Sequence, residues 1–138
     1  MEISIKKIIL LIQLACATYS INAQKYLPDT LQAHTNYDNV HARAIYHDSL
    51  TSHFAIWVKL KVKEHKHEYH TEQIIVLEGK GEFKLADSTF TIKKGDIIIV
   101  PQNTYHAVET SSKKPLKVIS IQAPYFDGSD RVFKPIPE

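Results

Sequence analysis

The stretch HKHEYHTEQIIVLEGKG, residues 65–81, contains the most informative pattern in this chain. Its second half is a short aliphatic run, residues 74–77, which closes on a turn containing Gly79. A short apolar run bounded by turn residues predicts a buried β-strand. Its first half places His65 and His67 two positions apart, and side chains two apart on an extended chain point to the same side. We therefore expect both imidazoles to face one space.

Strand-like segments continue on both sides of this stretch. Upstream, apolar residues occupy every second position over residues 54–62, which is the period of a strand. Downstream, residues 97–100 are β-branched throughout, and residues 116–123 form the last strong strand pattern. Sustained helical spacing is absent from residue 43 onward. Short strands at nearly even spacing predict an all-β fold, either a sandwich or a barrel.

The composition limits the size of the fold and the class of partner. A chain of 138 residues has room for one domain, and we expect an irregular N-terminal arm over residues 24–42 and a single β-barrel domain over residues 43–138. Seventeen basic and fifteen acidic residues leave a net charge of +2, which gives no reason to expect nucleic acid as a partner. The lone cysteine, Cys16, excludes an intrachain disulfide and a four-thiolate zinc site.

Residues 1–23 have the pattern of a secretory signal peptide. Two lysines precede an apolar run at residues 8–17, and an aliphatic residue, Ile21, followed by a small one, Ala23, predicts cleavage after Ala23. The run is shorter than the about 20 residues that a bilayer requires, so we expect no transmembrane segment after cleavage. The predicted location is periplasmic or secreted. A buried first helix and a lipid anchor on Cys16 are the alternatives.

Further potential metal ligands follow the paired histidines. Glu72 lies five positions after His67, and His106 stands at the start of another predicted strand. If these strands are neighbours, three imidazoles and one carboxylate meet, a donor set that suits Mn, Fe, Co, Ni, Cu or Zn. His70 is a rival ligand, but on a strict two-residue period it faces away from His67.

The spacing of these residues resembles the two motifs of the cupin superfamily. The first motif, G-x5-H-x-H-x3–4-E-x6-G, is matched by all of its residues except the first glycine, and the second, G-x5-P-x-G-x2-H-x3-N, by its opening glycine, its proline and its histidine. The matching positions are His65, His67, Glu72, Gly79, Gly95, Pro101 and His106. Three positions depart from the motifs: Lys59 and Asn103 replace glycines, and Thr110 replaces the final asparagine. Asn103 is a mild change, because asparagine adopts a positive φ more readily than most residues.

The resemblance implies a fold and a site. Cupins fold as a double-stranded β-helix, or jelly-roll barrel, with the metal inside, and the family's ligand positions fall on His65, His67, Glu72 and His106. A homodimer is implied by the same analogy. Within the superfamily, the chain resembles the small single-domain cupins.

Two function classes follow from this resemblance. The first is a metal-dependent enzyme, of dioxygenase, decarboxylase or isomerase type, acting on a small organic substrate. Its general base is not identifiable from the sequence, with Tyr105 and His70 as the available guesses. The alternative is a non-catalytic module that binds a small ligand or a metal, and a purely structural barrel is a third hypothesis.

Overall fold

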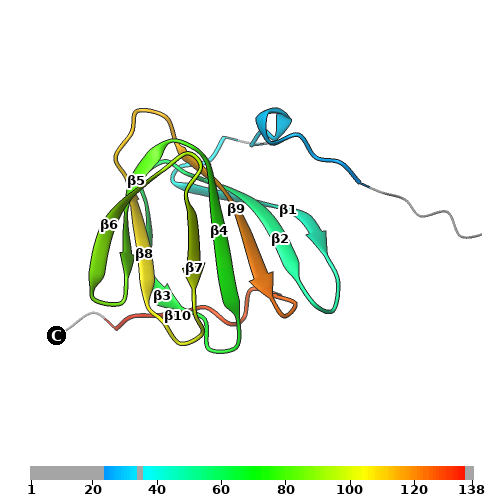
Figure 1. The fold of residues 1–138 in the computed structure, drawn as a ribbon, viewed down its shortest axis with the longest axis vertical. Coiled ribbons are helices and arrows are strands. Elements are labelled where there is room, and N and C mark those ends of the chain that lie inside the picture. The colour runs from blue at the N-terminus through cyan, green and yellow to red at the C-terminus, as the bar shows by residue number, and fades with distance from the viewer. Residues whose placement is uncertain (1–23, 34–35, 136–138) are drawn as a thin grey trace, which may run out of the picture.

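The computed structural model describes residues 24–33 and 36–135, which form two antiparallel sheets facing each other (Figure 1). The predicted signal peptide and Cys16 lie outside these residues. The strands, in chain order, are β1 (Val40–His47), β2 (Ser52–Val58), β3 (Lys61–Lys66), β4 (Thr71–Glu78), β5 (Lys80–Leu85), β6 (Ser88–Lys93), β7 (Ile97–Val100), β8 (His106–Thr110), β9 (Leu116–Ala123) and β10 (Val132–Phe133). β1 begins a little before residue 43, where the sequence analysis places the start of the barrel.

The strand order explains how distant segments become neighbours. One sheet has the order β1-β2-β9-β4-β7 and the other β10-β3-β8-β5-β6. Every strand pair is antiparallel, and most neighbours in a sheet are not consecutive in the chain. The prediction of an all-β fold is confirmed for the described residues, where the only helical element is a short 3-10 turn, Pro28–Thr30. None of the described helices could span a membrane.

The interior of the barrel changes from apolar to polar along its length. On β9, alternate residues face inward: Leu116 and Val118 join the apolar core, whereas Ser120 and Gln122 are buried polar residues farther along the strand. β4 lies beside β9 and repeats the change, because its apolar half is buried in the core and Glu72 pairs with Gln122. The polar end of the barrel is therefore where a functional site can lie.

The segment before β1 covers part of the outer face of the first sheet. Leu31 packs with Ala55 and Trp57 in a second apolar cluster outside the barrel. The Lys117 ammonium is buried beside this cluster and donates to the carbonyl oxygens of Pro28 and Leu31, each at 2.7 Å. These bonds satisfy a buried cation and attach the arm to β9.

Two turns use backbone that favours glycine. Gly79, between β4 and β5, has a φ of +84°, and a Cβ there would lie 2.8 Å from the backbone of both Pro115 and Leu116. Gly95, between β6 and β7, has a φ of +95° but open space around it. Asn103 takes a positive φ of 58°, as its replacement of a motif glycine led us to expect.

Candidate metal centre

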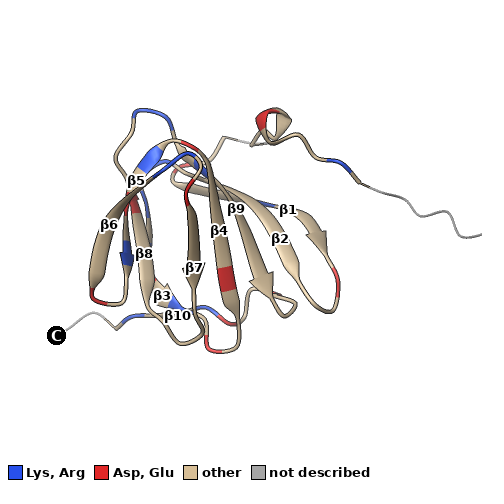
Figure 2. Ribbon diagram, in the orientation of Figure 1, with Lys and Arg blue, Asp and Glu red and all other residues tan. Residues whose placement is uncertain are grey.

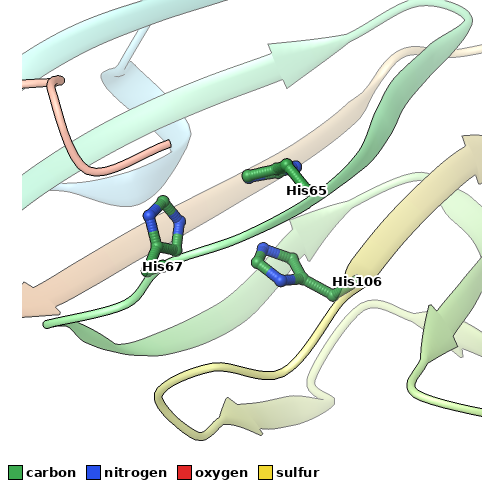
Figure 3. A group of neighbouring side chains, drawn as sticks. All are labelled: His65, His67 and His106. Carbon is green, nitrogen blue, oxygen red and sulfur yellow. The ribbon is translucent and has the colours of Figure 1, made fainter. Parts of the chain in front are cut away.

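The second sheet brings three histidines together at the polar end of the barrel (Figure 3). His65 lies on β3 and pairs in register with His106, the first residue of β8, and His67 follows the end of β3. All three are buried, and each offers a ring nitrogen within 4.8 Å of the others. The prediction that these imidazoles face one space is confirmed.

Backbone carbonyls orient all three rings in the same way. Nδ1 of His65 donates to the carbonyl of Lys63 at 2.8 Å, and Nδ1 of His106 donates to that of Thr104 at 3.1 Å. Nδ1 of His67 donates to the carbonyl of Asp130. In the neutral tautomer that these contacts favour, Nε2 carries a free lone pair on each ring. Nε2 of His67 and of His106 is buried with no hydrogen-bond partner in the described part of the chain.

Glu72 extends from β4, in the opposite sheet, toward these nitrogens. It is only 6% exposed, and its Oε2 lies 3.1 Å from Nε2 of His106 and 3.9 Å from Nε2 of His67. Its other oxygen, Oε1, accepts hydrogen bonds from the Ser120 hydroxyl and, at 3.4 Å, from the Gln122 amide. One oxygen is thus held by β9 while the other is directed toward the imidazoles.

Ser120 and Gln122 are two further residues of the site that were not expected from the sequence. The available signal was their position in the strand pattern of residues 116–123, where polar residues replace apolar ones at inward-facing positions. Their role follows from register: Ser120 lies opposite Ile74 on β4, diagonal to Glu72, and Gln122 lies directly opposite Glu72.

The charges favour a bound cation. Burial lowers the pKa of His65 to about 4 and also lowers the pKa of His67, so both are neutral near pH 7. Burial would raise the pKa of Glu72, but the imidazole of His106 and the hydroxyl of Ser120 outweigh it and hold that pKa at about 2. An ionised, buried carboxylate then lies 3.9 Å from the buried, unpartnered Nε2 of His67, and a bound cation would satisfy both groups.

The donor atoms also fit a transition metal in type and spacing. Imidazole nitrogen and carboxylate oxygen bind such ions at about 2.0–2.2 Å, so two donors on one ion lie about 3–4 Å apart. The separations of 3.1 and 3.9 Å from Oε2 of Glu72 fall in this range. Metal ions bind deprotonated ligands, and a hydrogen bond from the other ring nitrogen to a backbone carbonyl orients each imidazole for binding.

His70 does not join this group, because both of its ring nitrogens have other partners. Nδ1 donates to the Asp130 carboxylate, and Nε2 lies 2.9 Å from the carbonyl of Tyr125. Asp130 also accepts from the backbone N–H groups of Glu68 and Tyr69, each at 2.8 Å. Asp130 therefore attaches the C-terminal tail to the turn that carries His67, a role for which the sequence held no signal.

A cavity of about 420 Å³ extends from His65 and His106 into the barrel, and His67 is not among its lining residues. His65, Glu72, His106 and Gln122 line its polar end, and most of the other walls are aliphatic or aromatic side chains from the core. Neither Tyr105 nor His70 lines it, so the structure gives no support to either as a general base. The arrangement can hold a metal ion beside a space large enough for a small organic molecule.

Comparison with known proteins agrees with this architecture. A family model described as "Cupin domain" matches residues 53–122. The chain is 36% identical over 66 residues to the uncharacterized protein MJ1618 of Methanocaldococcus jannaschii, covering 48% of this chain and 53% of that protein. It is also 36% identical over 64 residues to the acireductone dioxygenase of Heterostelium pallidum, covering 42% of this chain and 44% of that protein. The chain thus spans about half the length of these relatives.

Solved structures share the fold at low identity. An uncharacterized conserved protein with a double-stranded β-helix domain from Klebsiella pneumoniae superposes with a TM-score of 0.71 at 14% identity, covering 83% of this chain and 93% of that one. KdgF from Halomonas superposes with a TM-score of 0.65 at 18% identity, covering 75% of this chain and 97% of that one. The predicted jelly-roll architecture therefore has close structural counterparts.

Proposed function

Because this chain belongs to the cupin family, we propose that it binds one divalent transition-metal ion and acts as a metal-dependent enzyme on a small organic substrate. The proposed ligands are Nε2 of His65, His67 and His106 and Oε2 of Glu72. The observation that carries this proposal is the convergence of Oε2 of Glu72 with Nε2 of His106, at 3.1 Å, and with Nε2 of His67, at 3.9 Å, at the buried polar end of the barrel. One cation bound between these atoms would satisfy the carboxylate and both nitrogens together.

Each ligand has a support that keeps it directed at the metal position. Carbonyls of residues 63, 104 and 130 hold the three rings, and Ser120 holds Glu72. Such contacts fix the imidazole tautomer and reduce the reorganisation needed when the ion binds. A bound divalent ion would supply Lewis acidity, or a binding position for O2, at its open coordination positions.

The rest of the cavity binds and shields the substrate. Most of its walls are apolar, and Glu72 is the only carboxylate among its described lining residues. Proton transfer by a second protein carboxylate is therefore not available inside the described cavity. This supports reactions in which the metal position does the main chemistry, of the dioxygenase, decarboxylase or isomerase type. The resemblance to an acireductone dioxygenase is consistent with the first of these.

The absence of a second carboxylate among the described lining residues also favours an alternative function. A non-catalytic module would use the same metal and cavity to bind a small ligand without turnover. Oxygen uptake, CO2 release and isomerisation assays on metal-loaded protein separate the two. Turnover that depends on the metal supports the enzyme, whereas tight ligand binding with no turnover supports the module.

Elemental analysis of untagged protein tests the metal site itself. We expect about one divalent transition-metal ion per chain, and its loss in the double variant His65→Gln, His67→Gln. His47→Gln is the matched control, because His47 is exposed at the end of β1 and does not line the cavity. Equal metal content in the double variant and the control would contradict the proposal.

We further propose that the protein is exported and that it forms a homodimer. The signal-like pattern of residues 1–23 supports export, and N-terminal sequencing of protein from the cell envelope or medium should begin at Gln24. An intact Met1 on that material would contradict export. Sedimentation of the purified protein measures its oligomeric state, and a monomer would contradict the homodimer.

A further inference from the structure

Arg131 is held beside the histidines by contacts on both sides of it in the chain. The preceding residue, Asp130, is bonded to the turn that carries His67, and the following strand, β10, pairs with the end of β3. In that pairing Phe133 lies opposite His65. The backbone of residue 131 therefore cannot move away from the metal position without breaking these contacts.

Arg131 is an exposed residue that lines the same cavity as three of the proposed ligands. Arg131 lines that cavity together with His65 and Glu72. Its Cζ lies 5.8 Å from the centre of the Phe126 ring, which is itself 5.2 Å from the ring of His67. The guanidinium therefore lies close enough to act on a molecule bound there.

Arg131 has no acidic partner among the residues that the structure describes. The nearby carboxylates are already paired, Glu64 with Lys84 and Lys134, and Asp130 with His70. The side chain of Arg131 forms no ion pair and no hydrogen bond within the described chain. Figure 2 shows that the region around β10 carries several basic segments.

The cavity as a whole then favours an anion. A dication with ionised Glu72 and three neutral imidazoles has a net charge of +1, and Arg131 adds a second positive charge. Lys61 and Lys63, both exposed, also line the cavity, and Glu72 is the only carboxylate among the described residues that line it. An anion bound in the cavity would interact favourably with both positive centres. The planar guanidinium pairs well with a carboxylate, to which it donates two parallel hydrogen bonds.

The apolar side chains that line the rest of the cavity indicate what the remainder of the ligand is. Val58, Ile74 and Leu116 are buried core residues that also line the cavity. These side chains offer no hydrogen bond, so they favour an apolar group. A ligand that matches both ends has a carboxylate at the metal position and an aliphatic or aromatic body in the barrel.

We propose that Arg131 determines substrate specificity by binding a carboxylate, and that the substrate is a small monocarboxylate with an apolar body. The identification of this molecule as a substrate rests on the proposed metal-dependent function. The preference for an anion rests on Arg131 and the cavity, and it can be measured separately.

The test compares two probes of the same shape, butanoate and its neutral amide, butanamide. Binding is measured by NMR titration with the untagged wild type, Arg131→Gln, Arg131→Lys and Arg43→Gln, each metal-free and loaded with Zn²⁺. Arg43 is the only other arginine in the chain; it lies on β1 and does not line the cavity. Zinc content is measured on the same samples.

We expect wild type and Arg43→Gln to bind butanoate at least about tenfold more tightly than butanamide, in line with a charge-assisted hydrogen bond. Arg131→Gln should bind the two probes almost equally, with its zinc content unchanged, and Arg131→Lys should keep part of the preference. An unchanged preference in Arg131→Gln, or no detectable binding of butanoate by the wild type, overturns the inference while leaving the metal site intact. Failure of all the proteins to bind zinc contradicts the proposed function instead, and the metal-free titrations then decide the role of Arg131.

Discussion

Replacing His65 by glutamine should flatten the pH dependence of folding stability in the metal-free protein. In the folded chain, burial lowers the pKa of His65 from 6.5 to about 4, whereas in the unfolded chain the imidazole keeps its ordinary pKa. Between these two values the unfolded state binds a proton that the folded state does not. Stability therefore rises with pH across this window and is lost as the pH falls from about 6.5 toward 4.

The size of this effect follows from the two pKa values. A difference of one in pKa corresponds to about 1.4 kcal/mol, so His65 alone accounts for a loss of about 3 kcal/mol between neutral pH and pH 4. The same linkage gives a slope of up to about 1.4 kcal/mol per pH unit in the middle of the window. Glutamine does not titrate, so the variant lacks this contribution at every pH.

Urea denaturation in the presence of a chelator, at several pH values from 4 to 7.5, measures the effect. The quantity compared is the change in the free energy of unfolding with pH. The free energies themselves are not compared, because the substitution also removes the hydrogen bond from His65 to the Lys63 carbonyl. His47→Gln should retain the wild-type slope, since His47 is exposed at the end of β1. Parallel pH profiles for wild type and His65→Gln would refute the reasoning that burial keeps this imidazole neutral.

Three further predictions concern the supports of the site and the turns. Ser120→Ala removes the hydroxyl that donates to Oε1 of Glu72, so isothermal titration calorimetry should show about 10- to 100-fold weaker Zn²⁺ binding. An unchanged affinity for Zn²⁺ would mean that Glu72 needs no such support. Asp130→Asn disturbs three charge-assisted hydrogen bonds, so it should lower the free energy of unfolding, measured by urea denaturation, by about 2 kcal/mol or more. Loss of an aspartate without such bonds would leave this free energy almost unchanged. Gly79→Ala should cost clearly more stability than Gly95→Ala, for which about 1 kcal/mol is expected, because both have a positive φ but only Gly79 lies against backbone. Equal thermal midpoints for the two alanine variants would contradict the last prediction.

The part of the site that could be predicted from sequence is the part with local spacing. His65 and His67 share a face because they lie two apart near the end of one strand, and this needs no knowledge of the rest of the chain. His106 could be added only through its motif, since its register with His65 arises from the pairing of β3 with β8. The pattern of alternation likewise predicted strands but not their order, which places β9 between β2 and β4.

The supports of the site depend on tertiary structure and have no local signature. The carbonyl that holds His67 belongs to Asp130, which is far away in sequence and reaches the site only because the C-terminal tail returns to β3. Arg131 is brought to the cavity by the same return of the chain. Neither residue stands out in the sequence, because an isolated aspartate and an isolated arginine in a polar tail are ordinary surface residues.

Anomalous X-ray diffraction from crystals of the untagged, metal-loaded protein tests the proposed metal centre most directly. The account predicts one anomalous peak in the barrel, at about 2.0–2.3 Å from Nε2 of His65, His67 and His106 and from an oxygen of Glu72. An ion bound elsewhere, or fully loaded crystals with no peak between these four side chains, would contradict it.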